Sequence, residues 1–157
     1  MPSLRLAARC ALIVAMLAAP VPTHAVNHLQ PHDAHALTQA DPSTVFVDVR
    51  TEIESLYVGR PHGVVHIPWY EYPHINKPDV EKFASEVEKT CKGKKETPVL
   101  LICRSGKRTL DAAHHLEKMG FKNVSHVVDG FEGDANHLNK RSLVNGWRFE
   151  GLPWEQT

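Results

Sequence analysis

The sequence lacks an excess of charge of either sign. Its 157 residues include 18 Lys and Arg and 18 Asp and Glu, so the formal net charge is zero. A neutral chain has no overall field that would attract a nucleic acid, and we expect no nucleic-acid partner. Internal repeats and low-complexity tracts are also missing. With 42% hydrophobic residues, a chain of this length can bury the core of one domain.

Long hydrophobic runs are scarce as well. The longest, "ALIVAMLAA" at residues 11–19, follows two arginines and precedes small residues. This pattern predicts a secretory signal peptide over residues 1–25, which leaves residues 26–157 as the mature domain. A membrane anchor is the alternative, but the run is about half of the ~20 residues that a spanning helix needs. We therefore expect a periplasmic protein that is free of the membrane after cleavage.

Cysteine is rare, with three in the chain, and Cys10 falls within the predicted signal peptide. Cys91 lies on the apolar stripe of a predicted amphipathic helix. Cys103 follows the strand-like "VLLI", whose four residues at ~3.3 Å each carry it more than ~10 Å across the sheet. Because a disulfide needs Cα atoms within ~7 Å, we expect two free thiols.

Apolar runs and helical patterns alternate along the chain. Strand-like runs occupy residues 44–50, 63–68, 98–103 and 123–128, and helical patterns occupy residues 32–40, 80–91 and 107–119. In the last helix, the apolar stripe runs through Leu110, Ala113, Leu116 and Met119. The alternation predicts a single α/β domain with a mostly parallel central sheet and helices on both faces. Ligands bind such sheets at the carboxyl ends of the strands, where Cys103 falls.

The loop after Cys103 is unusual for a structural cysteine. It reads "CRSGKR", and no acidic residue lies between Glu96 and Asp111. Thiols react as thiolates, which are favoured at a helix N-terminus and beside cations. The backbone N–H groups of the loop can also form a cradle for an anion, with Gly106 allowing the tight curve. The candidate binding residues are Arg104, Ser105, Gly106, Lys107 and Arg108, around an exposed nucleophile, Cys103.

A buried structural role for Cys103 is the alternative. Free cysteines are commonly buried, but three cations and a glycine directly after such a residue would have to stay solvated. We also expect Lys107 and Arg108 to keep their charged groups in water at the rim of the loop, where they would recruit an anionic donor.

These segments resemble the rhodanese (sulfurtransferase) family, especially its single-domain bacterial members. "CRSGKR" between a strand and a helix is similar to the active-site loop of that family. The resemblance extends over about residues 30–155 through "VFVDVRTEIE", "GVVHIP", "HVVDGFEG" and "NGWRFEGLPW". Two positions depart from the family pattern: Gly59 is followed by Arg60 instead of histidine, and Asp129 stands where a second glycine is common.

The resemblance implies a rhodanese-like enzyme of exported type. Cys103 would take a sulfane sulfur from a small anionic donor such as thiosulfate and hold it as a persulfide. It would then pass the sulfur to a thiol or to cyanide, and a protein persulfide is a further candidate partner. The resemblance implies neither a cofactor nor a metal.

Two other functions remain open. A cysteine phosphatase or arsenate reductase uses Cys-x5-Arg, whereas this loop has Cys-x4-Arg ending at Arg108, and Thr109 occupies the phosphatase position. The shorter loop favours sulfur over phosphate or arsenate. A non-catalytic persulfide carrier or redox-sensing module could use the same cysteine, and stoichiometric loading without turnover would identify it.

Polar residues outside the loop have simpler explanations. Asp48 and Arg50 end a predicted strand and could support the loop through hydrogen bonds, but a structural ion pair is favoured. His28, His32 and His35 have helical spacing, but Pro31 interrupts it, and no cysteine or carboxylate ligand is evident beyond Asp33. We therefore expect no metal site there.

Overall fold

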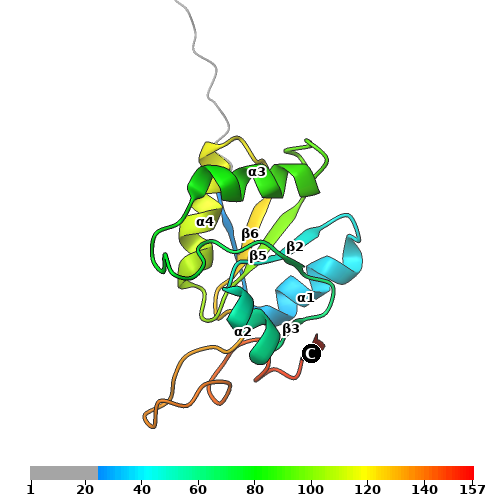
Figure 1. The fold of residues 1–157 in the computed structure, drawn as a ribbon. Coiled ribbons are helices and arrows are strands. Elements are labelled where there is room, and N and C mark those ends of the chain that lie inside the picture. Colours follow the sequence, from blue (N-terminus) through cyan, green and yellow to red (C-terminus); the bar gives the residue numbers. More distant parts are fainter. Residues whose placement is uncertain (1–24) are drawn as a thin grey trace, which may run out of the picture.

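The computed structural model describes residues 25–157 (Figure 1). The predicted signal peptide, residues 1–25, therefore lies outside the described residues except for Ala25. The strands are β1 (Asn27–Leu29), β2 (Val45–Asp48), β3 (Arg60–Pro61), β4 (Val65–His66), β5 (Val99–Ile102), β6 (Val124–Val127) and β7 (Trp154–Glu155). The helices are α1 (Pro31–Ala40), α2 (Glu52–Tyr57), α3 (Val80–Thr90) and α4 (Lys107–Lys118).

The central sheet is parallel, which confirms the predicted fold class. Its strand order is β1-β6-β5-β2-β4, and each of the paired strands runs parallel to its neighbour. Helices α3 and α4 cover one face, while α1 and the C-terminal tail cover the other (Figure 1). Strands β3 and β7 form a separate antiparallel pair. Within the described residues, no helix is both long and apolar enough to cross a bilayer.

The central strand β5 shows why the sheet needs two covering layers. All four of its residues are buried, as expected for a parallel strand with helices on both faces. Val99 and Leu101 face the core under α3 and α4, whereas Leu100 and Ile102 face α1 and the tail. Cys103, the next residue, continues on the side of α3 and α4.

The predicted elements agree with the observed ones within one or two residues at each end, but four further elements were missed. Strands β1, β3 and β7 and helix α2 have two to six residues each, too few to show a period. Pro31 does not interrupt a helix but begins α1, because proline is favoured in the first turn. In α4, Met119 is 41% exposed, and the buried face instead contains Thr109, Ala112, Ala113 and Leu116.

Both described cysteines are free thiols, as predicted. Cys91 is buried in the core beneath α3. Burial, with the nearby Glu88 carboxylate, raises the pKa of the Cys91 thiol. A raised pKa disfavours the thiolate, so Cys91 is suited to packing and poorly suited to nucleophilic attack.

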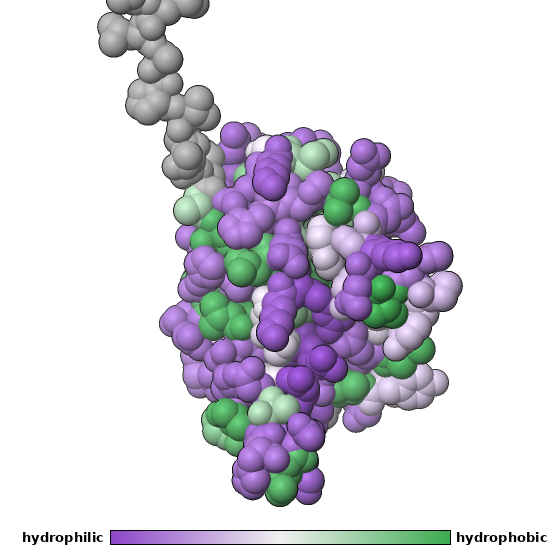
Figure 2. Space-filling model, turned by 90° about the vertical axis from the view of Figure 1, so that its left-hand side faces the viewer, coloured by the Kyte–Doolittle hydropathy of each residue, from purple (hydrophilic) through white to green (hydrophobic). Residues whose placement is uncertain are grey.

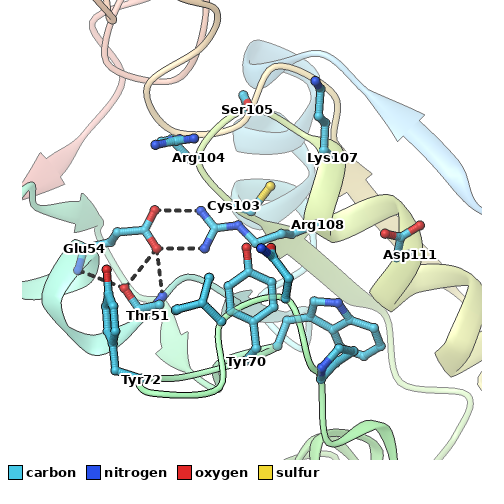
Figure 3. A pocket seen from close by; sticks show the side chains of 14 residues that line it. Thr51, Glu54, Tyr70, Tyr72, Cys103, Arg104, Ser105, Lys107, Arg108 and Asp111 are labelled. Carbon is cyan, nitrogen blue, oxygen red and sulfur yellow. Dashed lines mark hydrogen bonds and ion pairs between the residues drawn. The ribbon is translucent and has the colours of Figure 1, made fainter.

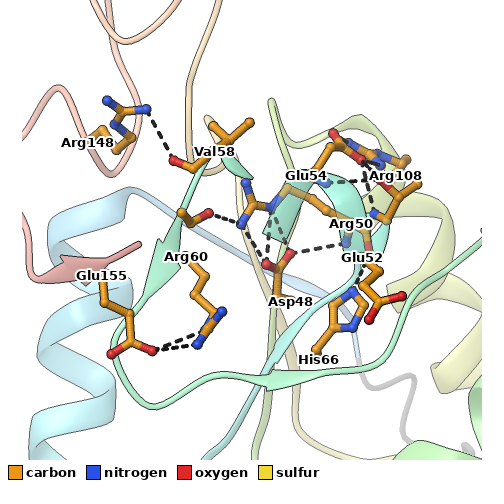
Figure 4. Close-up of polar contacts among 12 residues, drawn as sticks. Asp48, Arg50, Glu52, Glu54, Val58, Arg60, His66, Arg108, Arg148 and Glu155 are labelled. Atoms are coloured by element: carbon orange, nitrogen blue, oxygen red, sulfur yellow. Dashed lines mark hydrogen bonds and ion pairs between the residues drawn. The ribbon is translucent and has the colours of Figure 1, made fainter. Parts of the chain in front are cut away.

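A buried ion pair lies at the end of β2 (Figure 4). The Arg50 guanidinium donates to both carboxylate oxygens of Asp48, at 2.6 to 3.1 Å, and to the carbonyl oxygen of Gly59 at 2.6 Å. Both side chains are fully buried. This is the structural ion pair that the sequence favoured. The guanidinium also stacks 4.5 Å from the centre of the Phe131 ring, so the pair joins three segments that are distant in sequence.

Replacing Asp48 by asparagine is expected to destabilise the fold strongly. The change leaves the buried Arg50 charge uncompensated, which costs about 3–5 kcal/mol. The matched control is Glu155→Gln, whose partner Arg60 forms a half-exposed pair and whose loss costs at most about 1 kcal/mol. Urea unfolding with an unchanged m-value measures both. Equal midpoint shifts for the two variants would contradict this account.

Candidate active site

The loop after β5 curls tightly against the end of β6. Cys103 follows β5 directly, and α4 begins at Lys107. Gly106 precedes α4 with a φ of 84°, a left-handed conformation that favours glycine. A Cβ atom on Gly106 would clash with the carbonyl group of Val128. Glycine is therefore required here both for its conformation and for the close approach of β6.

A second segment clamps the backbone of this loop. The N–H of Phe131 donates to the Cys103 carbonyl at 2.7 Å, and the N–H groups of Glu132 and Gly133 donate to the Arg104 carbonyl at 2.9 and 3.2 Å. Gly130 makes the approach possible, since a Cβ atom there would lie 2.5 Å from the Cys103 carbonyl oxygen. Backbone hydrogen bonds thus fix the loop independently of its side chains.

The thiol of Cys103 is almost fully enclosed. The Gly106 N–H donates to its Sγ at 3.2 Å, and the Thr109 hydroxyl lies 3.7 Å from it. Only 1% of Cys103 is exposed, so the expectation of an exposed thiol was wrong. The curled loop places the amide of Gly106 and the first turn of α4 around the sulfur.

Cys103 nevertheless lines a pocket of about 840 Å³ (Figure 3). One wall comes from the cysteine loop and α4, and another from Thr51 and Glu54 at the start of α2. The remaining wall is the segment of residues 69–78, which contributes Trp69, Tyr70, Tyr72, Ile75, Asn76 and Pro78. The sulfur is therefore reached through a pocket with aromatic groups on one side and cations on the other.

Arg108 is not a free cation. Its guanidinium binds both carboxylate oxygens of Glu54, at 2.7 and 2.6 Å, and stacks 5.4 Å from the Tyr70 ring (Figure 3). Its side chain is 13% exposed, so the prediction that its charged group stays in water was wrong. Burial would raise the pKa of Glu54, but Arg108, together with hydrogen bonds from Thr51, lowers it to about 2.

Glu54 was missed from the sequence, although a signal was present. Thr51 and Glu54 form a capping box at the start of α2, and the pattern Thr-x-x-Glu indicates such a box. The pattern locates a helix start, but it does not reveal that the same carboxylate also binds an arginine on another helix.

Arg104 and Lys107 remain exposed at the pocket, which the half-buried Ser105 also lines. Among residues 25–157 neither cation has an ion-pair partner, and Asp111 also lines the pocket. Four of the five predicted binding residues thus line the pocket. The fifth, Gly106, offers its backbone N–H to the sulfur.

Asp48 and Arg50 lie outside the pocket. Arg50 contacts the loop only indirectly. It stacks on the Phe131 ring, and the Phe131 N–H donates to the Cys103 carbonyl. The three N-terminal histidines have separate partners: His28 contacts His126, His32 contacts Glu150, and His35 contacts Trp147. No group of three metal-ligating side chains occurs in the part of the chain that the structure describes.

Comparison with known proteins adds to this geometry. Residues 30–137 match the rhodanese-like domain family. An uncharacterized protein of Rickettsia conorii is 32% identical over 127 residues, or 78% of this chain and 91% of that protein. A thiosulfate sulfurtransferase of Coxiella burnetii is 38% identical over 63 residues, or 40% of this chain and 59% of that enzyme. A crystal structure from M. tuberculosis has a TM-score of 0.72 and 30% identity, and covers 84% of this chain and 98% of its own.

Replacing Glu54 by glutamine is expected to release the charge of Arg108 toward Cys103. Glutamine preserves the capping box, so the change mainly removes the compensating charge. The ratio of alkylation rates with anionic iodoacetate and neutral iodoacetamide should rise severalfold, since about 1 kcal/mol of attraction corresponds to a factor of about 5.

The control is Glu117→Gln, which removes a carboxylate on α4 that lies outside the pocket. An iodoacetate to iodoacetamide ratio that is equal in Glu54→Gln and in the unmodified protein would show that Arg108 does not act on anions at the sulfur.

Proposed function

Because this chain belongs to the rhodanese-like domain family, we propose that it is a sulfurtransferase that works through a persulfide on Cys103. The donor is a small anion with a sulfane sulfur, such as thiosulfate, and the acceptor is a thiol or cyanide. The observation that carries the proposal is the position of the Cys103 sulfur and the hydrogen bond that it accepts. Cys103 Sγ lies at the base of a pocket. It accepts a hydrogen bond from the N–H of Gly106, the residue directly before α4.

The proposed first step is a displacement at sulfur. The Cys103 thiolate attacks the outer sulfur of thiosulfate, a new S–S bond forms, and the old S–S bond breaks with its electron pair leaving on sulfite. The product is a Cys103 persulfide anion. The helix N-terminus and the Gly106 N–H stabilise negative charge at this position.

The second step regenerates the thiolate. A thiophilic acceptor attacks the outer sulfur of the persulfide, and the electron pair of the S–S bond returns to Cys103. The pocket of about 840 Å³ leaves room for acceptors larger than cyanide.

The cations have different roles in this proposal. Arg104 and Lys107 are exposed beside the pocket and attract the anionic donor. Arg108 is compensated by Glu54 and holds the wall of the pocket against Tyr70. The same ion pair disfavours the phosphatase alternative, because the arginine of the loop is already bound to a carboxylate and does not offer its guanidinium to an oxyanion.

Replacing Cys103 by serine is expected to abolish persulfide formation. Intact mass spectrometry after incubation with thiosulfate should show one added sulfur on the unmodified protein, removable by cyanide, and none on Cys103→Ser. Cys91→Ser is the control and should load normally, because Cys91 is buried in the core. Loading of Cys103→Ser would end the proposal. Loading without turnover in the presence of cyanide would instead identify a persulfide carrier.

Replacing Lys107 by alanine is expected to raise the thiosulfate KM up to about fivefold and to weaken its salt dependence, since an exposed charge contributes at most about 1 kcal/mol. The rate with neutral iodoacetamide should change little. Lys118→Ala, at the other end of α4, is the control and should leave both unchanged. A uniform fall in iodoacetamide reactivity with an unchanged KM would show that Lys107 acts on the sulfur and not on the donor.

A further inference from the structure

A line of polar side chains runs from Cys103 away from the pocket. Thr109 Oγ1 lies 3.7 Å from Cys103 Sγ and 3.1 Å from His126 Nδ1. The other ring nitrogen, His126 Nε2, lies 2.8 Å from His28 Nδ1. Thr109 and His126 are buried, whereas His28 is exposed. The line thus connects the buried sulfur to the protein surface.

The fold itself creates this line. Strands β1 and β6 pair in parallel with His28 opposite His126, and the two rings meet edge to face with centroids 4.8 Å apart. Thr109 lies in the first turn of α4, which packs over β6. None of the three polar side chains lines the pocket of Cys103, so the line ends on a different part of the surface from the one that a donor enters.

The Thr109 hydroxyl is placed to redirect a proton. Besides the sulfur and the His126 ring, it has the Gly106 carbonyl oxygen as an acceptor at 2.7 Å. The single hydroxyl proton can therefore be donated to any of three acceptors: the sulfur, the His126 ring nitrogen or the Gly106 carbonyl oxygen. When the hydroxyl turns toward His126 Nδ1, its oxygen lone pairs are free to accept the proton of the Cys103 thiol.

His126 is suited to pass a proton without keeping it. Burial, with the nearby His28 and His114, lowers the pKa of His126 to about 4, so its ring is neutral at neutral pH. A neutral imidazole can accept a proton at one nitrogen while it releases another from the second. At the sulfur end of the line, the charged group of Arg108 interacts with Cys103, and at the surface end Asp33 lines the same pocket as His28.

We propose that Thr109, His126 and His28 form a proton relay that carries the thiol proton of Cys103 to the surface at β1. The relay rests on the proposed function for its reaction. The thiol and thiosulfate give the persulfide anion, sulfite and one proton, so one proton must leave the enclosed sulfur whenever loading begins from the thiol. The proton passes to Thr109 Oγ1 while the hydroxyl proton passes to His126 Nδ1. The proton on His126 Nε2 passes to His28, which releases it to water.

The relay has a structural advantage over release through the pocket. During loading, the pocket holds the anionic donor, and its rim carries the cations Arg104 and Lys107. A proton that leaves through Thr109 and His126 passes neither the bound donor nor the cations of the rim. Donor entry and proton release can therefore occur together, on different sides of the loop.

The test is a rapid-quench measurement of persulfide formation with saturating thiosulfate. His28→Ala should slow loading by about tenfold or more, in the range that positioned proton transfer contributes. Added imidazole should restore the rate in proportion to its concentration, because it can occupy the exposed place of His28. His32→Ala, an exposed histidine of the same segment, is the control and should load normally with or without imidazole.

Two further measurements separate a relay from a structural role. Slow alkylation of His28→Ala by iodoacetamide should be unchanged, because it follows the equilibrium amount of thiolate and not the speed of proton release. Thr109→Ser should load faster than Thr109→Val, since only serine retains the hydroxyl. Normal loading by His28→Ala, slow loading without rescue by imidazole, or equal rates for the two Thr109 variants would overturn the relay.

Failure of the proposed function would be visible separately. If the unmodified protein forms no persulfide with thiosulfate, the sulfurtransferase proposal fails. The relay can then be tested alone by stopped-flow reaction with 4,4′-dithiodipyridine, a fast neutral disulfide that also requires loss of the thiol proton. The same slowing in His28→Ala and the same imidazole rescue are expected, and equal rates in His28→Ala and His32→Ala would overturn the relay.

Discussion

The candidate site depends on direct contact between two backbone segments. The N–H groups of Phe131, Glu132 and Gly133 bind the carbonyls of Cys103 and Arg104, and no side chain could fit between them at Gly130. The curled loop therefore keeps its shape even though three of its six residues are cations that repel one another. Without this clamp, the amide of Gly106 would have no fixed position relative to the sulfur.

The buried Asp48–Arg50 pair supports the same clamp from behind. Arg50 stacks on the ring of Phe131 and binds the Gly59 carbonyl, so the end of β2, the segment after α2 and the clamp are held as one unit. A buried ion pair is weak evidence for stability by itself, since hydrophobic residues can often replace it. Here the pair also orients a residue whose backbone touches Cys103, and an apolar replacement would lose the bond to Gly59.

The sequence was sufficient for the parts of the site that are local. The apolar strand, the glycine and the cations between Cys103 and Arg108 predicted a loop at the carboxyl end of a parallel strand, and the structure has it there. The sequence did not reveal contacts between segments that are distant along the chain. Glu54 and Arg108 are 54 residues apart, and the sequence, which offers at most a capping pattern for the start of α2, does not show that α2 faces α4. For the same reason Arg108 looked like a solvated cation and Cys103 like an exposed thiol.

His126 and His28 show the same limit more sharply. They are 98 residues apart and meet only because β1 pairs with β6, while β1 has three residues and no readable alternation. A buried histidine in a strand of otherwise small and apolar residues costs free energy unless both ring nitrogens are bonded. Thr109 and His28 satisfy both nitrogens, and a core filled by an apolar residue would need neither of them. Three matched polar side chains thus stand where one apolar residue would fill the core, and this is the physical reason to assign them a role in the chemistry of Cys103.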